Sequence, residues 1–327
     1  MSEEQEPDFM RSAQRFHVGE RAAGERLDVG LSRVLGESRG VVRKLLAAGA
    51  VGVRQEPGAA VRRVSLSEKG RIVGEAEVVW VQPGVGTPDE QALPEPDLGL
   101  RVLGRGRGWL AIDKPPGMPV HPLRSGERGT ALGFVASLRP EVHGVGEGGL
   151  RSGVVHRLDV GTSGAMLFGT EEVEWSRLRK AFARHRVTKT YRALVAGALH
   201  RPLQQELGLY VAQHRPARVR VIDVDAVAGY SGGRVIEQRV TPVERYAGAT
   251  LIEVSPVTGF LHQIRATLAH VGHPILGDAV YAPPKVAAGA SRPMLHAARV
   301  GFEEIEVHAP DAADFGALLD RLALESR

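Results

Sequence analysis

The sequence predicts an α+β protein with a small amino-terminal α/β module and a larger domain whose sheet is mixed and largely antiparallel. At 327 residues, with 43% hydrophobic and 24% charged side chains, the chain can bury a sizeable core. Near the start, two short helical patterns precede short β-like segments. After a stretch rich in Pro and Gly, further β-like runs alternate with two helical patterns.

Composition excludes several classes of function. The chain has no cysteine, which excludes disulfides, thiolate zinc sites and thiol nucleophiles. The histidines form no zinc-binding helical motif, so we expect no metal. The acidic start is no signal peptide, and no run of about 18 apolar residues is found. We therefore expect a cytoplasmic protein that does not contact membranes. The net charge of +4 suggests an anionic partner.

Changes in composition set the domain boundaries. The first residues are polar without a hydrophobic period, whereas Leu27, Leu31 and Leu35 lie at helical spacing. Ser38 is expected to cap a second helix that ends at Gly49. The predicted parts are a disordered leader at 1–20, a module at 21–83, a linker at 84–99 and a large domain at 100–327.

The second helix of the module carries a cluster of cations. Arg39, Arg43 and Lys44 lie within two turns. Two small helices followed by β segments, with cations on one helix, resemble the alpha-L RNA-binding module. This resemblance implies that these three side chains bind RNA. An ordinary solvated helix face remains the alternative, because basic runs alone are weak indicators of nucleic-acid contact.

The most informative segment runs from Gly153 to Gly169. An apolar strand start, a polar turn with two glycines and an apolar strand follow each other, so Asp159 is expected in a tight loop between strands. Gly161 and Gly164 would let the backbone approach a ligand closely. A carboxylate held in this way is suited to act as a nucleophile.

This segment resembles a known family motif. His156–Asp159 followed by Thr162–Gly164 is similar to the HRLDxxTSG signature of the RluA family of pseudouridine synthases. The resemblance implies a pseudouridine-synthase-like catalytic domain in which Asp159 attacks a uridine flipped out of structured RNA. Arg157 would fill the space that the base vacates. Whether the carboxylate attacks the uracil ring or the ribose anomeric carbon stays open.

Three further segments match the same family in the same order: Ala111–Pro122, Arg186–Gly197 and Thr258–Tyr281. They imply that Tyr191 lines the pocket, stacks on the base and assists the final proton removal. Arg265 is expected to pair with the carboxylate of Asp159 and keep it ionised. The other matched positions expected to bind substrate are Arg157, Thr162, Ser163, Gly164, Lys189 and His262.

The chain departs from the family pattern at three positions. Asp113 stands where Asn is commoner, and Phe260 and Leu261 replace an Arg-Thr or Arg-Ser pair. The second change removes a cation and a hydroxyl from the expected rim of the active site. It puts substrate contacts there in doubt and leaves the chemistry intact.

A basic run supports an RNA partner. Between Arg177 and Arg192 there are cations but no acids, while Trp175, Leu178 and Phe182 give that helix an apolar face. Arg177, Lys180 and Arg184 are expected to bind phosphates. The predicted partner is structured RNA, bound by a monomer. The resemblance suggests large-subunit ribosomal RNA, and the choice between ribosomal and transfer RNA stays open. Isomerisation needs no cofactor.

Two alternatives remain. A catalytically inactive RNA-binding or ribosome assembly factor could keep the cleft, and the altered Phe260–Leu261 rim is its only support. A nucleoside hydrolase could also use an aspartate nucleophile, and it would release free uracil.

Overall fold

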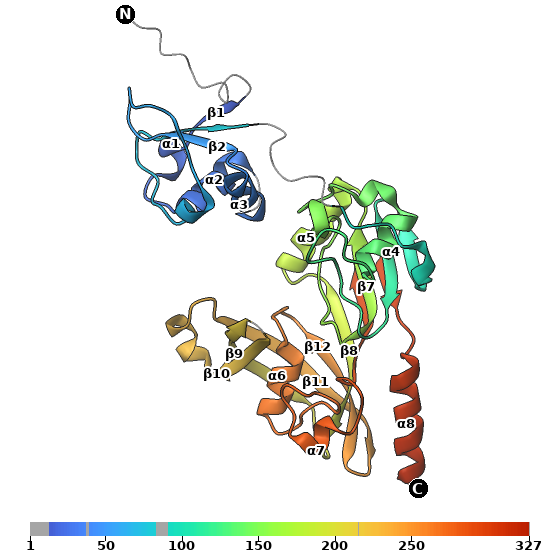
Figure 1. The fold of residues 1–327 in the computed structure, drawn as a ribbon. Coiled ribbons are helices and arrows are strands. Elements are labelled where there is room, and N and C mark those ends of the chain that lie inside the picture. The colour runs from blue at the N-terminus through green and yellow to red at the C-terminus, as the bar shows by residue number, and fades with distance from the viewer. Residues whose placement is uncertain (1–12, 37–38, 83–90, 215, 327) are drawn as a thin grey trace, which may run out of the picture. The chain divides into compact units, whose positions relative to one another are not determined.

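The computed structural model in Figure 1 describes residues 13–36, 39–82, 91–214 and 216–326, and leaves out the side chains of residues 39 and 40. The chain divides into two compact units, Met1–Glu90 and Gln91–Arg327. Both combine helices with antiparallel sheet, which confirms the α+β class. In the described part of the chain, no helix has the length and apolar character required to cross a bilayer.

The smaller unit packs short helices against a four-stranded antiparallel sheet with strand order β1-β4-β2-β3. Its elements are β1 (Gln14–His17), α1 (Gly19–Ala22), α2 (Leu27–Leu35), α3 (Arg39–Ala47), β2 (Val51–Arg54), β3 (Arg62–Arg63), the 3-10 helix η2 (Leu66–Glu68) and β4 (Val78–Val81). Leu27 and Leu31 of α2 and Leu46 of α3 are buried in its core. The expected helical period of α2 is therefore confirmed.

The beginning of this unit corrects the expected leader. Strand β1 pairs with β4, with Gln14 opposite Val81, and Val18 is fully buried. Residues 14–20 thus belong to the module, because a four-residue strand is too short to show a period of its own. Residues 1–12 and the expected cap Ser38 lie outside the described residues. Gly49 ends α3 in a left-handed conformation with φ of +66°, as predicted.

The larger unit is built on a ten-stranded sheet of order β10-β9-β11-β12-β8-β13-β7-β6-β5, and β14 pairs with β13. Strands β13 and β7 are parallel, and the other neighbours are antiparallel. The strands are β5 (Val102–Gly106), β6 (Trp109–Lys114), β7 (Ser163–Gly169), β8 (Thr188–Ala196), β9 (Leu203–His214), β10 (Ala217–Ile222), β11 (Arg234–Tyr246), β12 (Ala249–Pro256), β13 (Leu295–Phe302) and β14 (Ile305–His308).

Helices flank this sheet. The α-helices are α4 (Ala131–Leu138), α5 (Glu172–Ala183), α6 (Gln263–His270), α7 (Pro284–Ala287) and α8 (Ala313–Glu325), drawn in red at the end of the chain in Figure 1. The 3-10 helices are η3 (Pro96–Leu98), η4 (Pro140–Val142), η5 (Gly149–Arg151) and η6 (Val224–Gly229).

The second half of the expected linker belongs to the larger unit. Ala92 is buried, and the buried carboxylate of Glu95 accepts hydrogen bonds from the backbone N–H groups of Gly129 and Thr130. The linker boundary at residue 99 is therefore wrong, and the larger unit begins at Gln91. The Pro-rich composition of this segment resembles that of a linker. Its packing could not be predicted, because the segment contacts residues more distant in the sequence.

Helices α4 and α5 cover opposite faces of strands β6 and β7, because alternate strand residues point to opposite faces. Leu110, Ile112, Met166 and Phe168 pack in the cluster that contains α4. Ala111, Ala165 and Leu167 pack in the cluster that contains α5. This double covering explains the continuous apolar run of β7, every residue of which is buried.

Gly164 at the start of β7 permits the close approach of β13. Its φ is +115°, and a Cβ placed there would lie 2.2 Å from the carbonyl oxygen of Ala297. We expect Gly164→Ala to lower the free energy of unfolding by about 3 kcal/mol, from backbone strain and overlap together. Gly272→Ala is the matched control, since φ there is +85° but nothing lies within 4 Å of the added Cβ. Equal losses for both variants in urea unfolding would contradict the steric argument.

Candidate active site

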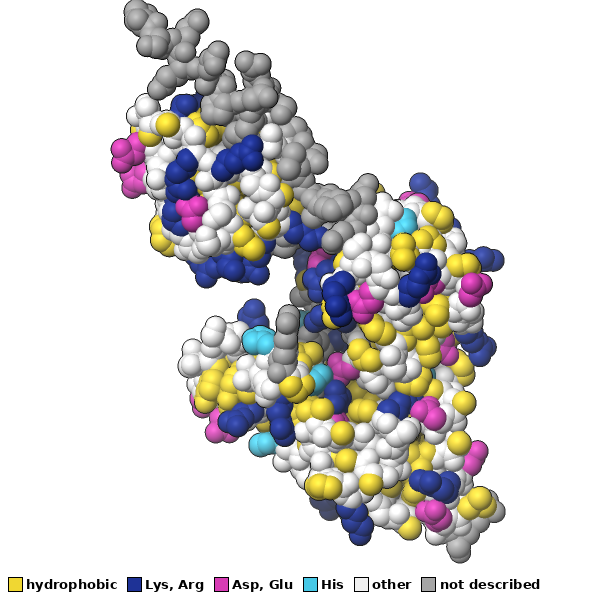
Figure 2. All heavy atoms as spheres, in the orientation of Figure 1, with side chains coloured by type: hydrophobic (Ala, Val, Ile, Leu, Met, Phe, Trp, Pro, Cys, Tyr) yellow, Lys and Arg dark blue, Asp and Glu magenta, His cyan; other side chains and the backbone are white. Residues whose placement is uncertain are grey.

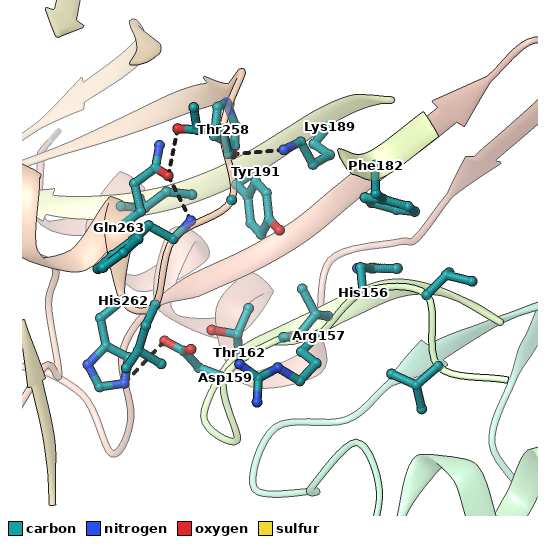
Figure 3. A pocket seen from close by; sticks show the side chains of 18 of the residues that line it. His156, Arg157, Asp159, Thr162, Phe182, Lys189, Tyr191, Thr258, His262 and Gln263 are labelled. Atoms are coloured by element: carbon teal, nitrogen blue, oxygen red, sulfur yellow. Dashed lines mark hydrogen bonds and ion pairs between the residues drawn. The ribbon is translucent and has the colours of Figure 1, made fainter. Parts of the chain in front are cut away.

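A cavity of about 500 Å³ lies in the larger unit. It is formed by the loop before β7, by β8, by the turn after β12 and by the start of α6. Figure 3 shows how side chains from these segments converge on it. The residues that line it include His156, Arg157, Asp159, Thr162, Lys189, Tyr191, Thr258, His262, Gln263 and Arg265.

Asp159 lies in a loop that precedes β7, but the strand expected before the loop is absent. Val154 makes only an isolated bridge to Phe168. Beyond it, the Nε2 atom of His156 accepts a hydrogen bond from the backbone N–H of Leu167 at 3.0 Å. This side-chain hydrogen bond takes the place of the backbone hydrogen bonds that a paired strand would make. The His156 ring also stacks on Phe182 of α5, with centroids 4.6 Å apart. This packing fixes the segment that leads to Asp159.

His156 gives the fold a specific sensitivity to acid. Burial, with smaller effects of Lys189 and Arg179, lowers the pKa of its imidazole from 6.5 to about 3. Between these two pH values the unfolded chain binds more protons than the folded one, so stability falls as pH falls, by up to about 1.4 kcal/mol per pH unit. His156→Gln retains an acceptor for Leu167 without titrating. We expect its unfolding free energy to decline less steeply than that of the wild type in urea titrations between about pH 6 and pH 4. Parallel declines would contradict this prediction.

The carboxylate of Asp159 is held by a buried arginine. Arg265 Nη1 donates to Asp159 Oδ2 at 3.1 Å, while Nε and Nη2 of the same guanidinium each donate to Asp278 at 2.8 Å. Burial lowers the pKa of Arg265, but the hydrogen bonds and charges of the two carboxylates outweigh this and raise it. The guanidinium therefore stays charged and has a fixed orientation.

Tyr191 and Lys189 lie on one face of β8, as the period of two predicted. The Tyr191 ring points into the cavity (Figure 3). Burial, and to a smaller extent the charge of Asp159, raises the pKa of its phenol. Lys189 Nζ donates to the carbonyl oxygen of Thr258 at 2.8 Å, and burial lowers its pKa to about 8.

Gln263 shapes the rim between β12 and α6. Its Oε1 atom accepts from the Thr258 hydroxyl at 2.9 Å and from the Phe260 backbone N–H at 3.0 Å. Phe260 and Leu261 pack beside an apolar cluster formed by β9, β10, β11 and α6. The departure from the family pattern at these two positions thus has a packing explanation, although both residues also line the cavity.

Two buried basic side chains, Lys114 and Arg292, donate hydrogen bonds to the loop after Asp159. Lys114 Nζ donates to the carbonyl oxygen of Val160 at 3.2 Å. Arg292 Nη1 donates to the carbonyl oxygen of Gly161 at 3.1 Å, and Nη2 donates to the Ser163 hydroxyl at 3.1 Å. Arg292 is in turn bound by Asp314 at the start of α8. These anchors hold the backbone that carries the Asp159 carboxylate.

Comparison with known proteins identifies the family of the chain. The family profile described as RNA pseudouridylate synthase matches residues 108–270. An uncharacterised RNA pseudouridine synthase of Mycobacterium bovis is 33% identical over 303 residues, which cover 89% of this chain and 92% of the relative. A ribosomal large subunit pseudouridine synthase D of Neisseria meningitidis is 30% identical over 321 residues, 93% of this chain and 80% of the relative. The chain belongs to the RluA-type family of RNA pseudouridine synthases.

The fold of this synthase also matches a solved structure. Human RNA pseudouridylate synthase domain containing 1 superimposes with a TM-score of 0.55 at 21% identity, over 69% of this chain and 93% of that one. The predicted pseudouridine-synthase-like catalytic domain is therefore confirmed. The enzyme is an isomerase that converts uridine in RNA to pseudouridine.

The fold of the synthase brings most of the predicted site residues together. Seven line the cavity: Arg157, Asp159, Thr162, Lys189, Tyr191, His262 and Arg265. Ser163 and Gly164 do not, and their contacts within the fold give each of them a structural role. The Ser163 hydroxyl is buried against Arg292 and His296, and Gly164 makes room for backbone of β13. Gly161 likewise faces the ring of Pro293 and does not line the cavity.

The three cations expected to bind phosphates on α5 and at its end differ in whether carboxylates already pair with them. Arg177 is bound by the carboxylates of Glu174, Glu303 and Glu304, which neutralise its charge, so phosphate binding by Arg177 is not supported. Lys180 and Arg184 are exposed and form no ion pair within the described part of the chain. On the face of the larger unit in Figure 2, Lys and Arg side chains are interspersed with Asp and Glu.

In the smaller unit, Arg43 bonds to the buried carboxylate of Asp28 at 3.3 Å and remains nearly half exposed. Lys44 also has an interaction partner. The side chain of Arg39 lies outside the described residues. Nowhere in the described ranges do three or more His, Asp or Glu side chains gather in a way that could hold a metal ion.

Asp278, Tyr281, Lys114 and Arg292 were not predicted as part of the site. Asp278 and Tyr281 stand inside the matched segment Thr258–Tyr281 and Lys114 inside Ala111–Pro122, so the resemblance already pointed to these three positions. A buried acid next to a glycine, as in Gly277–Asp278, carries no local signal for an arginine thirteen residues earlier.

Proposed function

We propose that this synthase isomerises uridines in structured RNA, with large-subunit ribosomal RNA as its substrate, and that Asp159 is the nucleophile. The observation that carries the proposal is the Asp159–Arg265 pair at the cavity. In the described structure, Oδ2 of Asp159 is bound by Arg265 and Oδ1 accepts no hydrogen bond. One carboxylate oxygen is thus free to attack while the guanidinium favours the ionised form.

The cavity suits an extruded nucleotide. Its volume of about 500 Å³ lies in the range of small-ligand pockets. A uridine inside a helix could not reach Asp159, so it must be flipped out, at a cost of a few kcal/mol. Arg157 is exposed at the cavity and makes no bond within the described residues, which leaves it available to fill the vacated space.

The proposed reaction breaks the bond between uracil N1 and ribose C1′, and the base rotates. A bond then forms between C5 and C1′, and C5 loses its proton. Asp159 attacks either the ring or C1′, and both routes use the same free oxygen. Tyr191 stacks on the base. It is also proposed to assist the removal of the C5 proton, which the released carboxylate of Asp159 can accept.

Ribosomal RNA is proposed because the relative from Neisseria meningitidis is named for the ribosomal large subunit. The smaller unit, with its exposed cations, is proposed to bind RNA as an alpha-L-like module, and the enzyme is proposed to act as a monomer in the cytoplasm. Mapping pseudouridines in ribosomal RNA from cells with and without the gene tests the substrate. If the pseudouridines of ribosomal RNA were unchanged and one in transfer RNA were lost, the substrate would be transfer RNA and not ribosomal RNA.

Tritium release from RNA labelled at C5 of uridine tests the activity itself. An isomerase releases tritium and leaves pseudouridine in the chain. A pure RNA-binding or assembly factor releases none, and a hydrolase releases free uracil. Phe260 and Leu261 pack against an apolar cluster, so the altered rim has a structural explanation that does not require an inactive protein.

A further inference from the structure

His262 lies beside the nucleophile and is held there through its Nδ1 atom. Its Nε2 atom lies 3.9 Å from Asp159 Oδ2, and its Nδ1 atom lies 2.9 Å from the hydroxyl oxygen of Tyr281. The two rings meet edge to face with centroids 5.6 Å apart. Figure 3 shows the imidazole directed towards Asp159. The orientation of the imidazole in the cavity is therefore defined.

The hydrogen bonds of the Tyr281 hydroxyl favour one tautomer of His262. The backbone N–H of Val219 donates to the Tyr281 oxygen at 2.9 Å, so this oxygen already serves as an acceptor. Its single proton needs an acceptor, and in the described structure His262 Nδ1 is the one in place. When Nδ1 accepts, the proton of a neutral imidazole must reside on Nε2.

The surroundings keep the imidazole neutral. Burial, together with the cation of Arg265, lowers the pKa of His262, and the opposing charges of Asp159 and Asp278 do not reverse this. The Arg265 guanidinium also lies over the Tyr281 ring, 5.3 Å from its centroid. A neutral imidazole with Nδ1 occupied presents one N–H group to the cavity.

Among the residues that the structure describes, that N–H group has no hydrogen-bond acceptor. The distance of 3.9 Å to Asp159 is too long for a hydrogen bond, and the His262 side chain keeps 12% of its surface exposed. The backbone of His262 is held in the left-handed region, with φ of 51° and ψ of 19°. Residues other than glycine adopt this region at an energetic cost, and such strain concentrates at functional sites.

We propose that Tyr281 is a positioning residue that fixes His262 as the Nε2–H tautomer, and that this N–H donates to a carbonyl oxygen of the target pyrimidine. The second half rests on the proposed function. When the bond from N1 to C1′ breaks, negative charge spreads over the two uracil carbonyl oxygens. A donor already aimed at one of them stabilises this charge without reorganisation.

Nitrogen-15 NMR of the full-length protein, labelled at histidine, tests the tautomer directly. We expect His262 Nδ1 to resonate as an unprotonated nitrogen and Nε2 as a protonated one at neutral pH. Tyr281→Phe should convert this single form into a mixture, whereas Tyr246→Phe, which removes a surface hydroxyl bonded to Glu244, should leave it unchanged. A protonated Nδ1 in the wild type would overturn the assignment, even if the Tyr281 variant did not fold.

Single-turnover tritium release tests the role of the donor. The amide nitrogen of glutamine can reach the position of Nε2, whereas that of asparagine corresponds to Nδ1. We expect His262→Gln to stay within about tenfold of the wild type and His262→Asn to lose about a hundredfold. Tyr281→Phe should lose about tenfold at unchanged RNA affinity. Equal rates for the Gln and Asn variants would refute the donor role.

The two proposals fail separately. If the wild type shows the expected tautomer but releases no tritium from any RNA, the proposed function fails and the role of Tyr281 stands. If the wild type is active but His262 is protonated on Nδ1, the function stands and the inference fails.

Discussion

Asp159→Asn is expected to reduce single-turnover tritium release from uridine-labelled RNA by at least about 10⁴-fold. An amide of nearly the same shape keeps the contact to Arg265 through its oxygen but supplies no anionic nucleophile. The variant should still bind RNA, because the cations proposed to bind phosphates are unchanged.

The same variant should fold normally. The Asp159 side chain is 25% exposed, and Arg265 keeps both hydrogen bonds to Asp278. We expect the free energy of unfolding to change by about 1 kcal/mol or less in urea titrations. Asp320→Asn, on an exposed turn of α8, serves as the matched control and should retain full activity. Turnover in Asp159→Asn above this limit would refute the assignment of the nucleophile.

Arg265→Ala is expected to have the largest effect on stability as well as to abolish activity. Asp278 is only 1% exposed, and the guanidinium is its sole cationic partner in the described structure. Removing the cation would leave a buried carboxylate supported only by the backbone N–H groups of Val280 and Tyr281. The expected loss is about 3–5 kcal/mol in the free energy of unfolding.

Two further variants serve as controls for this prediction. Arg321→Ala removes an exposed arginine of α8 whose side chain and partner Glu325 are each about 60% exposed, so stability should change by no more than about 0.5 kcal/mol. Arg265→Lys keeps a charge but cannot bind both carboxylates, and it should fold with strongly reduced turnover. Similar losses for the Arg265 and Arg321 alanine variants would contradict the buried-pair argument.

Local sequence predicted the elements whose signals are local. The helical spacing of Leu27 and Leu31 identified α2, and Gly49 identified the end of α3. The strand expected before Asp159 was wrong because His156 uses its side chain in place of the backbone ladder. The linker was drawn too long because the burial of Glu95 depends on Gly129 and Thr130, which follow more than thirty residues later.

The residue types of the matched segments, read in order along the chain, determined by themselves the family and the positions of Asp159, Tyr191 and Arg265. Only the tertiary structure decided how these groups are held. Arg265 meets Asp159 across 106 residues of sequence, and Arg292 meets Gly161 across 131. It also decided that Ser163 and Gly164 support the fold while Tyr281 and Asp278 belong to the site. The physical reason is that hydrogen bonds and burial join atoms that are near in space, whereas spacing along a chain specifies only the neighbours on one helix or strand.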